Sequence, residues 1–305
     1  MKKTLKTIGI ILLSLIVLIS LLGIILFSRP LVPKEYWNKV ETGGSIEAAY
    51  LKTGAYEVST FKERVLQGFG SYEVFYPADL ENGSKAYPVV IFVNGSGTPV
   101  EKYNIILRHM ASWGFIAIGT EEKYDWNGFA SEMCFRHLDK LNKDSQSVLF
   151  GKIDLDNVGI VGHSQGGVGV ISALTIQEHK NRYKAAVSLS PTNKVLADNL
   201  EWHYDATLID TPILLLAGAG GGDDWVVTGE QLSEIFADIS APKIKARRKD
   251  TIHNEVLYTT DGYVTAWFMW MLQGDGTAGK AFTGADAEIA NNPLYQDVEA
   301  KFPIE

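Results

Sequence analysis

Short apolar runs that alternate with segments of helical periodicity limit the folds open to this chain. The runs span residues 88–93, 115–119, 158–161, 185–189 and 212–217. They lack the apolar–polar alternation of a half-exposed strand, which indicates strands covered on both faces. Within 100–113, apolar residues recur every three or four positions, the pattern of a helix that buries one face. The alternation predicts a mostly parallel sheet with helices on both faces.

The rest of the chain extends this pattern to about eight strands. Early strands at 56–61 and 71–76 should pair antiparallel. Further helices are expected at 131–148, 165–177, 228–239 and 262–272, and a further strand at 244–248. The last helix is apolar on all sides and should be buried, with Asp261 as its cap and Gly274 at its end. Only residues 191–211 join their two flanking strands, which is too short a segment for a large cap domain.

The first thirty residues differ from the remainder of the chain. Residues 8–27 carry no charge, and twenty helical residues rise about 30 Å, the thickness of a bilayer's hydrocarbon core. Lys2, Lys3 and Lys6 precede this run, which favours an N-terminus inside the cell and the remaining chain outside it. We expect residues 1–29 to form one transmembrane anchor. A cleaved secretory signal, which would release the protein, is the alternative.

A short polar connector, 30–50, should lead from the anchor to a single domain, 51–305. Four of the 28 basic residues and none of the 36 acidic residues fall within 1–29, so this domain is strongly acidic. Such a charge makes nucleic acid a poor partner. Cys134 is the single cysteine, which excludes an internal disulfide and suits a small buried side chain.

Residues 158–167, VGIVGHSQGG, place a serine between a predicted strand and a predicted helix. In this context Gly-x-Ser-x-Gly forms a sharp, strained turn that presents the Ser164 hydroxyl above the sheet. A side chain at Gly162 or Gly166 would collide in such a turn. The helix N-terminus beside the serine favours developing negative charge. We predict that Ser164 is a nucleophile, the alternative being a tight turn with an idle serine.

Several segments together carry a family resemblance. They are residues 72–77 (YEVFYP), 87–97 (YPVVIFVNGSG), 162–167 (GHSQGG), 189–191 (LSP) and 214–227. From about residue 55 onward, the chain resembles the α/β-hydrolase superfamily. It is most similar to bacterial secreted esterases of the dienelactone-hydrolase-like and polyester-hydrolase-like (cutinase-type) groups. The resemblance implies an α/β-hydrolase fold with catalytic residues in the chain order Ser, acid, His.

A serine hydroxyl needs a general base to accept its proton, and three histidines follow Ser164. His179 ends the predicted helix after the serine, and His203 lies in the 191–211 crossover. His253 follows the last predicted strand, which matches the position of the family's catalytic histidine. We predict that His253 is the base and keep His203 as the alternative. His163, beside the nucleophile, should be a packing residue.

The carboxylate that orients the base should follow the strand at 212–217. Asp223 and Asp224 both do. In similar enzymes the acid precedes a residue pair that ends in an apolar side chain, which favours Asp224. Asp223 remains the alternative, and Asp250 is a weaker third candidate. The acid would hold the imidazole tautomer and stabilise the imidazolium.

Hydrolysis also needs donors for the oxyanion of the tetrahedral intermediate. The resemblance implies two backbone N–H groups, those of Gln165 and Ser96. Asn94 stands where the family usually has histidine, which alters loop hydrogen bonding without removing the donor. Gln165 stands where polyester-cleaving relatives favour methionine, which weakens the case for synthetic polyesters as substrates.

The sequence leaves open what lines the substrate pocket. Tyr124, Trp126 and Trp225 lie in loops near the predicted carboxyl edge of the sheet, where they would line an acyl or aromatic pocket. Ordinary packing under loops is the equal alternative for all three.

The leading functional hypothesis is a carboxylic-ester hydrolase that forms an acyl-enzyme on Ser164 and acts on a small-molecule or lipid-like ester. The same triad serves peptidases, thioesterases and acyltransferases, and a non-catalytic binding protein with this fold is a further alternative. No His-Glu-x-x-His sequence or clustered metal-ligand spacing indicates a metal, and no motif indicates another cofactor.

Overall fold

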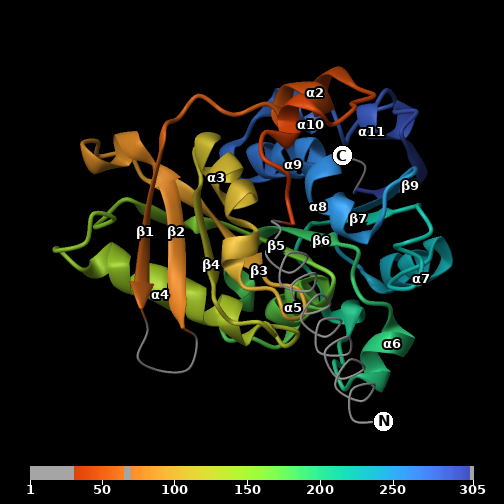
Figure 1. The fold of residues 1–305 in the computed structure, drawn as a ribbon, viewed down its shortest axis with the longest axis horizontal. Coiled ribbons are helices and arrows are strands. Elements are labelled where there is room, and N and C mark those ends of the chain that lie inside the picture. The colour runs from red at the N-terminus through yellow and green to blue at the C-terminus, as the bar shows by residue number, and fades with distance from the viewer. Residues whose placement is uncertain (1–30, 65–69, 303–305) are drawn as a thin grey trace, which may run out of the picture.

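The computed structural model describes residues 31–64 and 70–302, which form one twisted sheet between two layers of helices (Figure 1). The described strands are β1 Val58–Arg64, β2 Ser71–Pro77, β3 Tyr87–Val93, β4 Ile116–Thr120, β5 Ile153–His163, β6 Tyr183–Leu189, β7 Ile213–Gly218, β8 Lys243–Arg248 and β9 Tyr295–Lys301. Their order across the sheet is β1-β2-β4-β3-β5-β6-β7-β8-β9. The sheet is parallel from β4 to β8, whereas β1, β2 and β9 run antiparallel at its edges.

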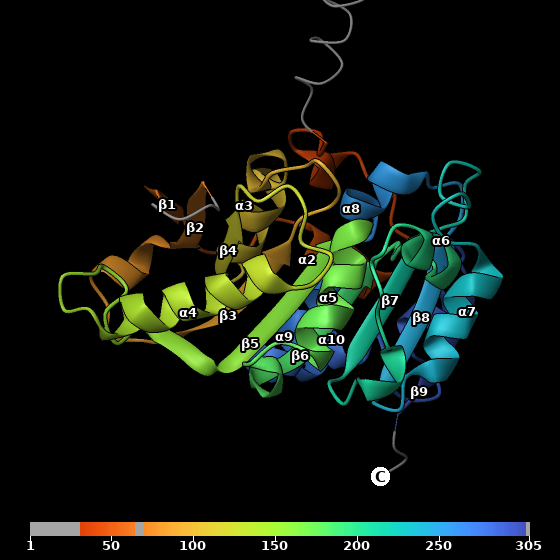
Figure 2. The ribbon, with the colours of Figure 1, turned by 90° about the horizontal axis from the view of Figure 1, so that it is seen from below.

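Helices cover both faces of this sheet, as the sequence predicts. The described α-helices are α2 Ser45–Leu51, α3 Asn104–Ser112, α4 Phe129–Lys143, α5 Gln165–Thr175, α6 Lys194–Asn199, α7 Gly229–Asp238, α8 Val256–Thr259, α9 Asp261–Gln273, α10 Gly276–Gly279 and α11 Glu288–Asn291. In Figure 2, α4 and α5 lie in front of the sheet, with α9 and α10 behind it. Each face has its own hydrophobic core, which explains why the central strands are apolar without interruption.

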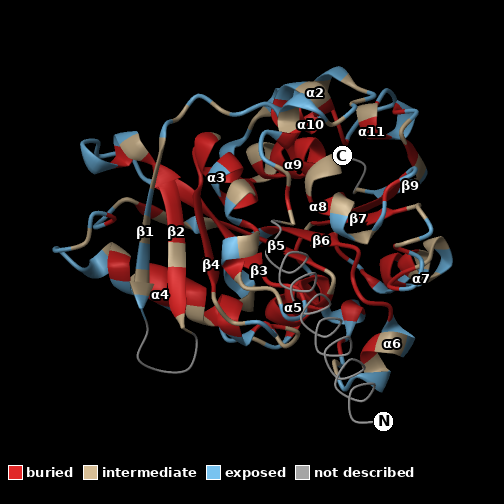
Figure 3. Ribbon diagram, viewed as in Figure 1, coloured by how far each residue is buried: buried red, intermediate tan, exposed pale blue. Residues whose placement is uncertain are grey.

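Strand β3 shows how one strand serves both cores. Val89 and Ile91 pack with α4 and α5, whereas Val90 and Phe92 pack with α3 and α9. All seven residues of β3 are buried. Figure 3 shows the same burial in the neighbouring strands, in contrast to β1 at the edge.

Several element boundaries differ from the expected ones. The helix expected to extend to residue 148 ends at Lys143, and the segment expected as one helix from 100 to 113 starts with a separate 3₁₀ turn, Val100–Lys102. The N-cap of the last long helix is Thr260; Asp261, expected as the cap, is its first residue and pairs with His109. Strand β9 was not expected, since its polar residues carry no buried-strand pattern.

The segment expected as a polar connector, 30–50, packs against the domain through several buried residues. Val32 and Tyr36 are buried, and Glu47 forms a buried ion pair of 2.8 Å with Arg248 of β8. The tyrosine hydroxyl also donates to Asp261 at the start of α9. The first described residues therefore belong to the folded unit.

The expected anchor, within residues 1–29, lies outside the described residues. Across 31–64 and 70–302, the helices are all too short or too polar to serve as a membrane span.

Candidate active site

Ser164 lies in the turn between β5 and α5, at the carboxyl edge of the parallel strands. Its backbone adopts φ 61° and ψ −120°, a conformation that residues other than glycine rarely hold. The turn is as crowded as the motif predicts. A Cβ at Gly162 would lie 2.2 Å from the Gly166 carbonyl oxygen, and one at Gly166 would lie 2.2 Å from that of Val93. The flanking glycines thus permit the strained turn that carries the serine.

The loops after β7 and β8 bring a carboxylate and an imidazole together. These strands pair in parallel, with Gly218 beside Arg248 at their ends. Asp223 and His253 each lie five residues further on. The His253 Nδ1 lies 2.6 Å from the Asp223 Oδ1, and the carboxylate is fully buried. A carboxylate only accepts, so Nδ1 carries the proton and Nε2 is left as an acceptor.

The sequence favours Asp224 as the partner of His253, but the structure places Asp223 against this imidazole instead. The Asp224 side chain is half exposed and points away, with its Oδ1 2.6 Å from Arg247 Nη2. Consecutive side chains leave the backbone in different directions, and here a tight turn, with the Asp223 amide donating to Gly220, aims Asp223 inward.

The second carboxylate oxygen of Asp223 accepts two hydrogen bonds. Its Oδ2 accepts from the Ser190 hydroxyl at 2.8 Å and from the Gly218 amide at 2.5 Å. The sequence analysis gives Ser190 no role, although Ser190 lies in the segment 189–191 (LSP) that carries part of the resemblance.

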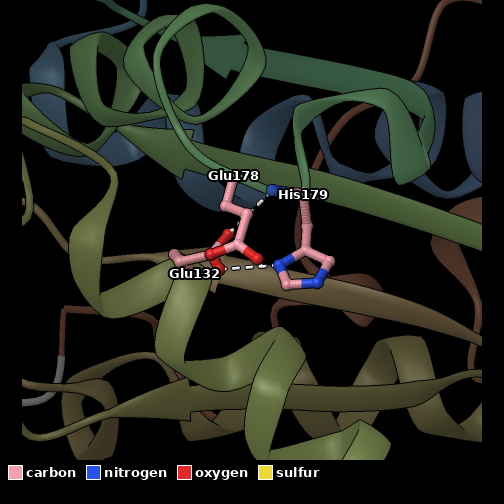
Figure 4. A group of neighbouring side chains, drawn as sticks. All are labelled: Glu132, Glu178 and His179. Atoms are coloured by element: carbon pink, nitrogen blue, oxygen red, sulfur yellow. Dashed lines mark hydrogen bonds and ion pairs between the residues drawn. The ribbon is translucent and has the colours of Figure 1, made fainter.

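The alternative histidines lie elsewhere. His203 is exposed and pairs with Asp198 at 3.0 Å. The Nδ1 of His179 lies 2.7 Å from Glu132 (Figure 4). Neither is placed beside Ser164 by any contact within the described part of the chain.

The surroundings of His179 also contain the group of side chains that most resembles a metal site among the described residues. Ligand atoms of Glu132, Glu178 and His179 lie within 4.8 Å of one another. Arg136 hydrogen-bonds to both carboxylates, so their charge is balanced by a guanidinium. The group is thus an ion-pair network that joins α4 to the end of α5.

His163, expected as a packing residue, also contacts the proposed base. Its ring centroid lies 4.4 Å from that of His253, and its Nε2 donates to the His253 carbonyl at 2.9 Å. Burial, with the neighbouring His253 as a further cause, lowers the pKa of His163 well below its usual value. A neutral ring therefore braces the backbone of His253.

In the loop after β3, the amides on both sides of Ser96 have acceptors within the described chain. The Gly95 amide donates to the Tyr103 hydroxyl at 3.1 Å, and the Gly97 amide donates to the Lys123 carbonyl at 2.8 Å. Within the described chain, the amides of Ser96 and Gln165 have no such partner. Both predicted oxyanion donors are therefore available.

Asn94, which stands where the family usually has histidine, makes two side-chain hydrogen bonds to a neighbouring loop. Its side-chain Nδ2 donates to the carbonyls of Thr120 and Glu122, at 2.7 and 2.6 Å. The amide thus ties the loop after β3 to the loop after β4.

The three aromatic residues proposed for the substrate pocket, Tyr124, Trp126 and Trp225, lie in different places. Trp225 is 67% exposed, and its ring centroid lies 5.6 Å from that of His253. Tyr124 lines a cavity of 450 Å³, together with Glu101, Glu121 and Lys123. Trp126 is partly buried in the same loop. Trp225 is the one that the structure places beside His253.

A mostly parallel sheet with helices on both faces and a serine in a strained strand–helix turn defines the class of α/β-hydrolases. The chain belongs to the PET hydrolase-like family, whose model matches residues 37–225. This match includes Ser164 and Asp223, whereas His253 lies beyond it.

Curated relatives agree with this assignment. The chain is 26% identical over 185 residues to a bis(hydroxyethyl) terephthalate hydrolase of Streptomyces coelicolor, covering 59% of this chain and 53% of the relative. It is 25% identical over 194 residues to cutinase est1 of Thermobifida alba, covering 61% and 60%. It is 26% identical over 165 residues to cutinase cut1 of Thermobifida fusca, covering 52% and 50%. The chain thus spans between half and three fifths of the length of these relatives.

Proposed function

We propose that this protein is a carboxylic-ester hydrolase that forms an acyl-enzyme on Ser164, with His253 as general base and Asp223 as the orienting acid. The observation that carries this proposal is the 2.6 Å contact between His253 Nδ1 and Asp223. His253 in turn contacts His163, the residue before Ser164, and Ser164 is held at positive φ. The names of the relatives, a terephthalate-ester hydrolase and cutinases, support an ester as the substrate.

Acylation begins when the Ser164 oxygen attacks the ester carbonyl carbon and its proton passes to His253 Nε2. The imidazolium that results keeps its Nδ1 proton, which it donates to Asp223. The Asp223 carboxylate is buried, and it stabilises the imidazolium through this hydrogen bond without taking the proton.

The carbonyl oxygen becomes an oxyanion as the tetrahedral intermediate forms. The amides of Gln165 and Ser96 donate to it, and the loss of one such donor costs about 2.7–4 kcal/mol of transition-state stabilisation. Collapse of the intermediate breaks the ester C–O bond, and His253 gives its proton to the departing alcohol. Water then repeats the sequence on the acyl-enzyme and releases the acid.

Hydrolysis of p-nitrophenyl acetate, butyrate and palmitate by the full chain tests this proposal. We expect wild-type turnover to vanish in Ser164→Ala and to fall by several orders of magnitude in His253→Ala. His203→Ala is the matched control, because His203 is an exposed histidine with its own carboxylate partner. Full activity of Ser164→Ala, or loss in His203→Ala with His253→Ala active, would contradict the assignment.

We propose further that residues 8–27 hold the folded domain at the outer face of the cell membrane, with release after cleavage as the alternative. The support is the uncharged twenty-residue run and the three lysines before it. Mass spectrometry of the mature N-terminus separates the two: retention of Met1 or Lys2 in the membrane fraction supports the anchor, and a new N-terminus near residue 30 in the medium opposes it.

A further inference from the structure

Two serines occupy equivalent positions at the carboxyl edge of the sheet. Strands β5 and β6 are parallel neighbours whose last residues, His163 and Leu189, are paired. Ser164 follows the first and Ser190 the second. Each serine donates its amide to the neighbouring strand, Ser164 to the Leu189 carbonyl at 2.9 Å and Ser190 to the Leu216 carbonyl at 2.7 Å.

Ser190 shares the backbone strain of Ser164. Its φ is 42°, in the left-handed region that residues with a Cβ rarely occupy. Strained residues persist where the surrounding structure fixes them, and they cluster at functional sites. Ser190 is fully buried, so this strain serves no solvent-exposed turn.

The hydroxyl of Ser190 has a single, specific acceptor. Its Oγ lies 2.8 Å from Asp223 Oδ2, while Oδ1 of the same carboxylate accepts from His253. The remaining donor to Oδ2 is the Gly218 amide, which is fixed in β7. Two donors on one oxygen set the rotation of the carboxyl group about its Cβ–Cγ bond, and that rotation aims the other oxygen at the imidazole.

We propose that Ser190 is a positioning residue, which acts on the proposed reaction through the orientation and charge of Asp223. The inference rests on the proposed function, because it assigns Asp223 as the acid. The buried hydroxyl stabilises the ionised carboxylate by a hydrogen bond to a charged acceptor. Without it, the carboxylate is free to turn about its Gly218 contact, and His253 Nδ1 loses a fixed partner.

Ser188 provides a matched control in the same strand. It is also fully buried, and its hydroxyl also makes one hydrogen bond, of 3.0 Å, to the Gly167 carbonyl. Its acceptor belongs to α5 and not to Asp223. Ser188→Ala and Ser190→Ala therefore each remove one buried hydroxyl group. They differ in the acceptor that loses its hydrogen bond, the Gly167 carbonyl in the first and the Asp223 carboxylate in the second.

Kinetics of p-nitrophenyl butyrate hydrolysis in a double-mutant cycle test the coupling. We expect Ser190→Ala to lower kcat about tenfold with KM unchanged, as for one hydrogen bond to a charged group. Ser188→Ala should stay within about twofold of wild type. In an Asp223→Ala background, Ser190→Ala should have almost no further effect, because the group through which it acts is gone. Equal losses in both backgrounds would overturn the proposal.

The low-field proton NMR spectrum gives a readout that does not depend on turnover. The resonance of the His253 Nδ1 proton is identified as the one that Asp223→Ala abolishes. We expect it to broaden or shift in Ser190→Ala and to be unchanged in Ser188→Ala. An unchanged resonance in Ser190→Ala would overturn the positioning role.

The two proposals fail in different ways. If wild type hydrolyses no ester, or if Ser164→Ala stays active, the proposed function fails. If wild type is an esterase and Ser190→Ala behaves as Ser188→Ala does, only the role of Ser190 fails.

Discussion

Among the described residues, two Asp–His pairs have a buried carboxylate and similar geometry, and only one of them lies at the candidate active site. His253 and Asp223 are 2.6 Å apart, and His109 and Asp261 are 2.8 Å apart. His109 precedes Ser164 in the chain, so it falls outside the order Ser, acid, His that the family resemblance implies.

The difference between the pairs lies in the other ring nitrogen. The Nε2 of His109 donates to the carbonyls of Leu51 and Lys52, at 3.0 and 2.8 Å, and its side chain is fully enclosed. Its Nδ1 faces Asp261, so both nitrogens face acceptors, which favours the protonated imidazolium. His253 keeps Nε2 unbonded within the described chain, and 14% of its side chain is exposed. A carboxylate partner thus makes a general base only where the second nitrogen is free to take a proton.

The largest expected effect lies in the acid of the first pair. Asp223→Asn should lower kcat about 10⁴-fold, because the amide would hold the wrong imidazole tautomer. Asp224→Asn should leave kcat within about threefold, since this carboxylate pairs with Arg247 near the surface. Steady-state hydrolysis of p-nitrophenyl butyrate measures both. A larger loss in Asp224→Asn would show that the two aspartates have been assigned the wrong way round.

The second pair should matter for stability and not for chemistry. Asp261→Asn leaves a buried imidazolium without its counter-charge, which costs about 3–5 kcal/mol of unfolding free energy. The Tyr36 hydroxyl would lose a charged acceptor at the same time. Urea unfolding gives the stability change, and kcat well below the melting temperature should stay near wild type. A catalytic loss without a stability loss would contradict this division of roles.

The smallest of the three expected effects is the change in stability with pH that the titration of His109 produces. Burial lowers the pKa of His109, but Asp261 and the two carbonyls outweigh it, so the pKa is raised above 6.5. A raised folded-state pKa contributes stability that is fully present below the unfolded value, near 6.5, and is lost as the pH rises through the folded value. Urea midpoints of wild type should therefore fall relative to those of His109→Gln as the pH rises above about 6.5. A constant difference would show that His109 keeps one protonation state throughout.

Much of the fold follows from local sequence. The uninterrupted apolar runs correspond to β3 to β7, and the helix expected to be apolar on all sides is α9, in which Trp267 is fully buried. Gly274 ends that helix at φ 70°, as expected. Strand β9 could not be predicted from the sequence, because it is an edge strand whose residues are mostly exposed. Its pairing with β8 alone defines it as a strand.

The sequence by itself determined the strand–helix turn at Ser164, because Gly162, Gly166 and the flanking periodicities are all local. It also placed His253 in the loop after β8, through chain order. Only the tertiary structure decided between Asp223 and Asp224 and added Ser190 to the carboxylate's partners. The physical reason is that a side chain's direction depends on loop closure across neighbouring strands, and residues tens of positions apart meet only when the sheet is formed.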